Sequence, residues 1–209
     1  MNKRKLGLFY NKNCLQNVLM GIIDDSSHFR KVCVNSHVVF VDDKGYVIGF
    51  NILQADFLID NLVEGFLYPG DELLAKIEKI LSINLKPYYQ QRAFLIGEVV
   101  DFEGIEGTHL RKCKINVGES EFLNIVCGAN NFCRNDGVVV AVEGCVMPNG
   151  QIVKKQKVYG EIYSEGMMCS YRELNLPHLP EEEKGIICLP LDCHENKVGN
   201  EFFRVYAHY

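Results

Sequence analysis

The sequence predicts a mostly β protein of the α+β class, in which a small strand-rich α/β domain precedes a five-stranded Greek-key barrel. Three observations support this prediction. The chain has 209 residues, which suits two small domains better than one. Short runs of β-branched and aromatic residues recur between turn residues, as is typical of strands. Residues 71–81 change to the spacing of an α-helix. We expect the domains to span residues 1–85 and 91–209.

Five strand-like runs fill the first domain, and each is short enough to end at a turn. They cover residues 6–10, 18–23, 29–34, 38–41 and 46–53. The fourth and fifth runs are separated by Asp42-Asp43-Lys44-Gly45. This sequence predicts a hairpin, because Gly45 can adopt a positive φ without steric cost.

The helix is predicted from residues 71–81, which place apolar side chains on one face and charged side chains on the other. Asp71 is the expected N-cap, because its carboxylate can accept hydrogen bonds from the free N–H groups of the first turn. Residues 82–91 contain the pair Lys86-Pro87 and are expected to end the helix and to link the two domains.

The second domain is expected to hold five short β-rich segments. They cover residues 93–102, 110–117, 121–127, 137–143 and a hairpin that turns at Pro148-Asn149-Gly150. Five strands in about 80 residues suit a closed Greek-key barrel such as the OB-fold, because closure removes unpaired strand edges. The sequence Ser170-Tyr171-Arg172-Glu173 matches a capping box and predicts a short helix from Tyr171.

The charge of the chain excludes a protein that coats nucleic acid by bulk electrostatics. The formal net charge is -5, from 22 Lys and Arg against 27 Asp and Glu, whereas such proteins are strongly basic. Most of the acidic excess lies in residues 173–209, which carry 3 basic and 7 acidic residues. A local basic surface elsewhere is therefore compatible with the sequence.

The apolar and cysteine patterns indicate a cytoplasmic protein without membrane association. No apolar run approaches the roughly 18 residues that a membrane-spanning helix needs. The nine cysteines form no CxxC pair, and we expect them to be buried, reduced and free of disulfides. The alternative is a zinc site in which Cys169 joins Cys188, Cys193 and His194. Because a second close ligand pair is missing, we expect no metal.

Catalytic motifs are missing from the sequence, which lacks GxSxG, GxxxxGK and GxGxxG. The acidic pairs Asp24-Asp25 and Asp42-Asp43 fall at turns, where solvated side chains are the common finding. We therefore expect neither an enzymatic activity nor a cofactor. An enzyme or a thiol-redox protein is an alternative that rests on the number of cysteines alone.

Three blocks in the second domain carry a resemblance to a known family. They are IVCGANN at residues 125–131, SEGMMCS at 164–170 and EEEKGI at 181–186. In this order they resemble the tRNA-binding OB domain of the phenylalanyl-tRNA synthetase β subunit, which also occurs in some methionyl- and tyrosyl-tRNA synthetases. Together with LFYN at residues 8–11, the organisation resembles the free-standing YtpR-type proteins, in which a small domain precedes the tRNA-binding domain.

The resemblance implies that the partner is tRNA or another structured RNA, bound on the barrel face near the last strand. The RNA-binding residues that it implies are Asn130, Lys154, Lys155, Ser164, Gly166, Met167 and Ser170. Ser164 and Met167 would meet a base or ribose, and the lysines would contact phosphates. Tyr159, Tyr163 and Tyr171 are candidates for base stacking, with ordinary packing as an equal alternative.

One departure from the family pattern bears on this function. Tyr159-Gly160 stands where the family has Arg-Gly, and Glu161 follows it. The loss of the arginine predicts weaker contact with phosphates and a lower affinity for tRNA. The alternative function is therefore a protein-interaction module that keeps the OB scaffold but has lost RNA binding. The sequence leaves open the role of the first domain, the preferred tRNA and whether the chain forms a homodimer.

Overall fold

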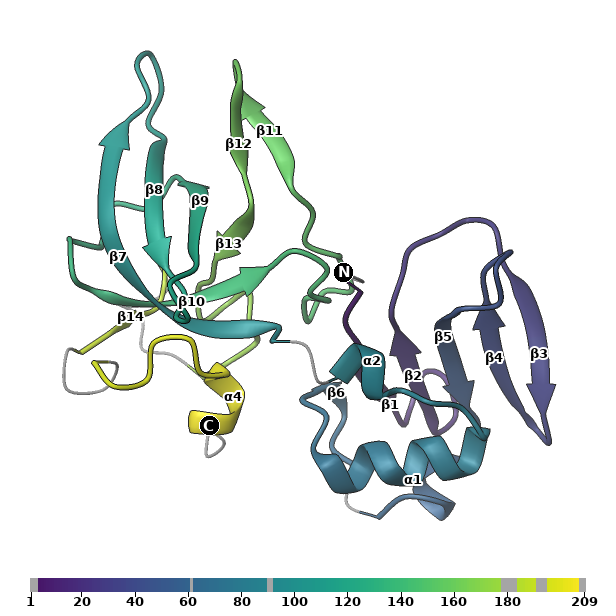
Figure 1. Ribbon diagram of the computed structural model, residues 1–209. Helices are drawn as coiled ribbons and strands as arrows, with labels where there is room; N and C mark the ends of the chain where they lie inside the picture. The colour runs from purple at the N-terminus through teal and green to yellow at the C-terminus, as the bar shows by residue number, and fades with distance from the viewer. Residues whose placement is uncertain (1–3, 61, 90–91, 178–183, 191–194, 207–209) are drawn as a thin grey trace. The chain divides into compact units, whose positions relative to one another are not determined.

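The structure of the protein is a computed structural model that describes residues 4–60, 62–89, 92–177, 184–190 and 195–206 (Figure 1). The chain divides into two compact units, one of residues 1–91 with 150–152 and the other of residues 92–149 with 153–209. Each unit has its own hydrophobic core. No helix among the described residues is long and apolar enough to cross a bilayer.

The first unit is built on a six-stranded antiparallel sheet in the order β3-β4-β5-β2-β1-β6. Its strands are β1 (Gly7–Asn11), β2 (Val18–Ile22), β3 (Arg30–Val34), β4 (His37–Val41), β5 (Val47–Ile52) and β6 (Gly65–Leu67). The five strands predicted from the sequence are confirmed. The sequence does not predict β6, because three residues are too few to show an alternating pattern.

Helix α1 (Asp71–Leu81) has the predicted bounds and packs on one face of this sheet. Ile77 and Leu81 of the helix are buried in the same core as Phe50 of β5. The N-cap is Gly70, so the prediction that Asp71 caps the helix is wrong. Asp71 is instead the first helical residue, where its negative charge interacts favourably with the positive end of the helix dipole.

The segment predicted as a linker is partly structured. Residues 86–89 form the short helix α2 (Lys86–Tyr89), and a 3-10 helix, η1 (Ala55–Phe57), follows β5. Leu85 and Tyr88 are buried in the core of the first unit. The predicted end of the helix is confirmed, and these two apolar side chains hold the described part of the predicted linker, residues 82–89, against the core.

The second unit contains an antiparallel path of five strands in the order β13-β10-β7-β8-β9, and β14 also pairs with β10. The strands are β7 (Phe94–Gly104), β8 (Arg111–Asn116), β9 (Phe122–Cys127), β10 (Gly137–Val142), β13 (Gly166–Met168) and β14 (Cys188–Leu189). A short helix, α4 (Phe202–Val205), follows. The four strands predicted between residues 93 and 143 are confirmed.

Strands β9 and β13, the two ends of this path, are not paired as a ladder among the described residues. Hydrogen bonds instead join β9 to Ser164 and Glu165, the two residues that precede β13. The Glu165 N–H donates to the Asn124 carbonyl at 2.8 Å, and the Val126 N–H donates to the Ser164 hydroxyl at 3.0 Å. The prediction of a mostly β protein is confirmed, whereas the sheet is open and closure into a five-stranded barrel stays a prediction.

A hairpin of β11 (Gln156–Tyr159) and β12 (Ile162–Ser164) extends from the second unit in the same direction as the β7–β8 hairpin (Figure 1). The sequence does not predict it, because β11 is exposed at every position and so has no apolar face. The predicted turn at residues 148–150 is present, with Gly150 at a φ of 85°. The predicted helix from Tyr171 is wrong, since residues 171–175 form turns.

Substitution of Gly166 tests how closely β10 and β13 pack. A Cβ at this position would lie 2.8 Å from the carbonyl oxygen of Ala141, a backbone atom that cannot rotate away. We expect Gly166→Ala to lower the free energy of unfolding by about 1–3 kcal/mol. Gly104→Ala in β7 is the control, because a Cβ there meets nothing within 4 Å. Equal thermal unfolding midpoints for the two variants would contradict this account.

Candidate functional site

The three sequence blocks, although far apart along the chain, line one hollow on the second unit. The hollow has a volume of about 320 Å³. The first block contributes residues 126–129, the second contributes Met167, Met168 and Ser170, and the third contributes Gly185 and Ile186. Arg172 and Glu173 complete the lining. The three blocks, which are separated along the chain, therefore lie together in the folded protein.

Asn131 holds the third block in place. Its side-chain oxygen accepts a hydrogen bond from the Ile186 N–H at 3.1 Å, and its side-chain nitrogen donates to the Ile186 carbonyl at 2.8 Å. One amide side chain thus satisfies both backbone groups of Ile186, as a neighbouring strand would. The predicted residue Asn130 is exposed and does not line the hollow. The two adjacent asparagines could not be told apart by sequence alone.

Ser164 is buried, and its hydroxyl bonds the neighbouring backbone. Its side chain is buried, with 3% of the residue surface exposed. The hydroxyl accepts from the Val126 N–H and donates to the Gly166 carbonyl at 2.9 Å, so both of its main hydrogen-bonding functions are used. The predicted contact of Ser164 with a base would require the hydroxyl to exchange one of these bonds, and it stays a prediction. Gly166 is likewise required for the close approach to β10 described above.

Met167 and Ser170, two of the predicted RNA-binding residues, line the hollow. The Ser170 backbone N–H donates to the Glu173 carboxylate at 2.7 Å, and the Ser170 hydroxyl accepts from the Glu173 N–H at 3.2 Å, which is the predicted capping-box geometry without the helix. Arg172 is exposed and forms no ion pair with a described residue. Arg172 belongs to the stretch that carries the family resemblance, but it is not among the RNA-binding residues predicted from the sequence.

The outward side of β8 and β9 carries cations and an aromatic ring. Cys113 and Ile115 of β8 are buried, and the alternation of the strand turns Lys112 and Lys114 to the other side. The Lys114 ammonium lies 4.7 Å from the ring centroid of Phe122, whose own side chain is exposed. We call the outward residues of β8, β9, β11 and β12 the outer face.

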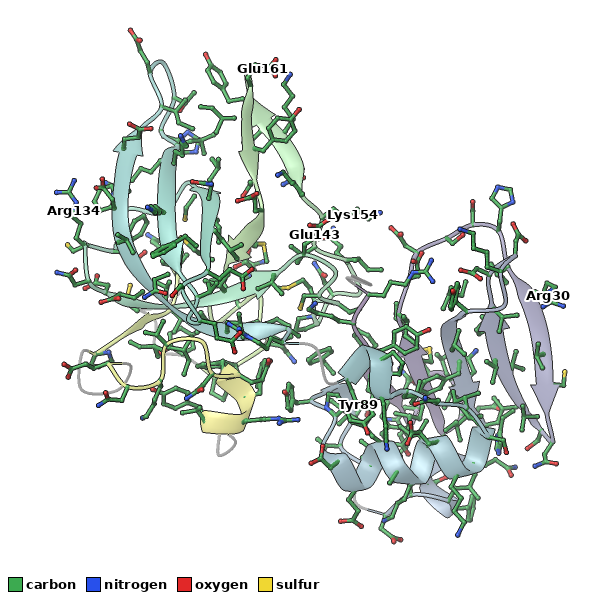
Figure 2. All side chains as sticks on the ribbon, in the orientation of Figure 1. Arg30, Tyr89, Arg134, Glu143, Lys154 and Glu161 are labelled. Carbon is green, nitrogen blue, oxygen red and sulfur yellow. The ribbon has the colours of Figure 1, made fainter. Side chains whose placement is uncertain are left out.

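The lysines of the β11–β12 hairpin are paired with acids. Lys155 contacts Glu165 at 2.9 Å, and Lys157 contacts Glu161 at 2.5 Å. Hydrogen bonding to Glu165 raises the pKa of Lys155, and the same bond lowers the pKa of Glu165. Figure 2 shows Glu161 at the tip of the hairpin and Lys154 at its base. The predicted residues Lys154 and Lys155 therefore lie along the hairpin and do not line the hollow.

Two of the three predicted stacking tyrosines are exposed on this hairpin. Tyr159 and Tyr163 have about half of their surface exposed, whereas Tyr171 is half-buried. The Lys155 ammonium lies 5.8 Å from the ring centroid of Tyr163. A Cβ on Gly107, in the β7–β8 loop, would lie 4.0 Å from the Tyr159 hydroxyl, so that loop reaches the hairpin. Exposure favours stacking over packing for Tyr159 and Tyr163.

Five of the eight described cysteines are at least partly buried, whereas Cys14, Cys33 and Cys133 are exposed, so the expectation of burial is wrong for these three. Burial raises the pKa of Cys113 to about 12 and that of Cys188 to about 11, which keeps both in the thiol form. Within the part of the chain that the structure describes, no three potential ligands come together to hold a metal ion. Cys193 and His194 of the alternative zinc site lie outside the described residues.

Comparison with known proteins adds independent information on this region. Residues 94–197 match a family model described as "Putative tRNA binding domain". An uncharacterized protein of Mycoplasma genitalium is 34% identical over 99% of this chain and 91% of its own length. The "Putative tRNA-binding protein YtpR" of Bacillus subtilis is 35% identical over 90% of this chain and 96% of its own length. The phenylalanine–tRNA ligase β subunit of Lactobacillus acidophilus is 36% identical over 68% of this chain and 19% of the subunit.

Ser164→Ala tests whether this residue supports the fold. The substitution removes the buried hydroxyl that accepts a hydrogen bond from the Val126 N–H. Because this N–H then lacks an acceptor, we expect the free energy of unfolding to fall by about 1–3 kcal/mol. Ser120→Ala is the matched control, because the Ser120 side chain is exposed and has no hydrogen bond to a described residue. Denaturant titration measures both variants. An unchanged midpoint for Ser164→Ala would show that the hydroxyl is dispensable.

The ion pair of Glu165 predicts a pH dependence of stability. Because the pKa of Glu165 is lower in the folded than in the unfolded chain, its contribution is complete above the ordinary value of 4.5 and is lost as the pH falls through the folded value. We expect Glu165→Gln to be less stable than the parent at neutral pH and to lose less stability on acidification. Glu161→Gln is the control, since its carboxylate is 86% exposed and solvent screens its ion pair. Parallel acid curves for the parent and Glu165→Gln would exclude the pair as the cause.

Proposed function

Because the chain belongs to the family of the tRNA-binding domain, we propose that its second unit binds tRNA, or another structured RNA, without catalysing a reaction on it. The observation that carries the proposal is the location of the outer face next to the hollow lined by the three blocks. Val126 lines the hollow from β9, and Asn124 of the same strand lies at the outer face. One surface therefore combines cations, exposed rings and a recess. This function belongs to the cytoplasm, where tRNA is used.

We infer that the second unit is an OB barrel whose seam lies between β9 and β13. The strand order β13-β10-β7-β8-β9 and the two hydrogen bonds across the seam support this inference. OB-folds bind oligonucleotides on their second and third strands and on two flanking loops. In this chain these parts are β8, β9, the loop after β7 and the connection that carries the β11–β12 hairpin. They are the parts that build the outer face.

The cations of this surface suit contacts with phosphates. Lys114 and Arg172 form no ion pair with a described residue, and Lys112 is 3.6 Å from the exposed carboxylate of Glu103. We assign the main phosphate contacts to these three residues, because an anion can approach them without first displacing a buried partner. Lys155 contributes less, since its hydrogen bond to Glu165 would have to be exchanged. Lys154 would extend the contact along the base of the hairpin.

The aromatic rings of the outer face suit unstacked bases. Phe122 and Tyr163 each have a lysine ammonium near the ring, and each ring is partly open to solvent. A base that stacks on such a ring contributes about 1–3 kcal/mol. Met167, on the lining of the hollow, offers a polarizable apolar surface to a base or ribose. We therefore infer that unpaired nucleotides meet the rings while the lysines hold the adjoining backbone.

A filter-binding titration with total tRNA at several salt concentrations tests the proposal. We expect Lys112→Ala with Lys114→Ala to weaken binding and to flatten the salt dependence by about one to two units, because two phosphate contacts are lost. Tyr163→Ala should weaken binding without changing the slope. Lys76→Ala with Lys79→Ala, on helix α1 of the first unit, is the matched control.

The same titration separates RNA binding from the alternative of a protein-interaction module. Failure of the parent protein to retain tRNA at low salt would reject the proposal. It would favour an OB scaffold whose lysines serve only as partners for Glu161 and Glu165. Equal loss in the helix α1 control would instead mean that the total charge of the protein governs binding, and would reject the outer face as the site.

A further inference from the structure

Five large apolar side chains are exposed at one end of the first unit. They are Leu15, Leu53, Phe57, Leu58 and Val63. Phe57 is 80% exposed and Val63 is 69% exposed, so these side chains contribute little to the core. Exposed apolar groups that gather at one place mark interaction surfaces in soluble proteins. We call these five residues the apolar end.

The topology of the first sheet brings the three loops that carry these residues together. The strands β5, β2, β1 and β6 are antiparallel neighbours. The β1–β2 turn, the end of β5 and the start of β6 therefore meet at the same end of the strands. Hydrogen bonds tie the loops. The Ala55 N–H donates to the Asn17 carbonyl at 2.8 Å, and the Asn13 side chain donates to the Glu64 carboxylate at 3.1 Å.

The charges around the apolar end are mainly negative. Residues 12–17 and 53–64 contain Asp56, Asp60 and Glu64, against Lys12 as their only basic residue. Burial raises the pKa of the Tyr10 hydroxyl, and the carboxylates of Asp56 and Glu64 raise it further. Both carboxylates therefore interact electrostatically with the same hydroxyl group, that of Tyr10. An exposed apolar group flanked by acids is complementary to an apolar group flanked by bases.

We propose that the apolar end binds a segment of another protein that forms an amphipathic helix, with apolar side chains on one face and Lys or Arg beside them. The site is distinct from the RNA surface proposed above. RNA is repelled by the three acids, and a second copy would bring six acids together. The five apolar side chains come from described loop residues and the 3-10 helix η1, and a surface of side chains suits the face of a helix better than an added strand.

Binding of a synthetic helical peptide to the full chain tests the proposal. The probe is a fluorescent peptide of about 18 residues, with Leu at helical spacing and Lys elsewhere. We expect Phe57→Ser with Val63→Ser to raise its Kd about tenfold or more. Asp56→Asn with Glu64→Gln should raise the Kd and reduce its salt dependence.

Matched controls separate this site from general attraction of a basic peptide to an acidic protein. Val32→Ser with Tyr46→Ser removes two exposed apolar groups elsewhere on the first unit, and Asp43→Asn with Glu106→Gln removes two charges elsewhere. Both control pairs should bind the peptide like the parent. A peptide with Glu in place of Lys should bind at least about tenfold more weakly than the probe.

Three results would overturn the proposal. The first is unchanged peptide binding by the Phe57 and Val63 variant at the unfolding temperature of the parent. The second is equal binding of the Glu peptide. The third is a parent dimer, seen by sedimentation, that the Phe57 and Val63 variant abolishes, because a second copy would then be the occupant. Retention of tRNA by this variant, measured in parallel, keeps a failure here separate from a failure of the RNA proposal.

Discussion

The surface of the second unit depends on how the segment before β13 is fixed between two strands. The Ser164 hydroxyl accepts from β9 at the Val126 N–H and donates to the carbonyl of Gly166. Gly166 then passes the backbone of β10 at a distance that leaves no room for a Cβ. Because Met167 follows directly, these contacts set its place on the lining of the hollow. The β11–β12 hairpin is anchored by the same segment, since β12 ends at Ser164.

Local pairing explains how an acidic chain can present a basic surface. Glu165 and Glu161 neutralise Lys155 and Lys157 on the hairpin, while the cations of β8 and the hollow are less compensated. Exposed charges farther apart than about 10 Å are screened at moderate salt, so the neighbourhood of a phosphate matters more than the net charge of -5. The paired lysines also hold the hairpin through Glu165, which contacts both Lys155 and Asn124.

The sequence predicted mainly elements that bury a continuous face; β3 is an exception, since it was predicted although four of its five residues are exposed. Helix α1 and the four strands between residues 94 and 142 have such faces, and their bounds agree with the predictions within two residues. The hairpin β11–β12 has a fully exposed first strand, and β6, β13 and β14 have only two or three residues each. Periodicity cannot detect such elements, because they show no alternation between buried and exposed positions.

The fold brings the three blocks together, whereas the assignment of single residues to an RNA site stays a prediction. Met167 and Ser170 line the hollow, but Ser164 is buried, and Asn131 rather than Asn130 bonds the backbone of the third block. The reason is that a short polar side chain has the same appearance in sequence whether it bonds a ligand or a neighbouring backbone group. Burial and hydrogen-bond partners distinguish these cases, and both depend on contacts between residues about 40 to 55 positions apart.

The two proposed surfaces have opposite electrostatic character, which bears on how one chain could serve both. The proposed phosphate contacts of the second unit are the cations Lys112, Lys114 and Arg172, whereas Asp56 and Glu64 flank the apolar end of the first unit. A basic helix is therefore repelled by the lysines of the second unit, and RNA is repelled by the acids of the first unit. Each proposed surface would therefore exclude the ligand of the other by its charge.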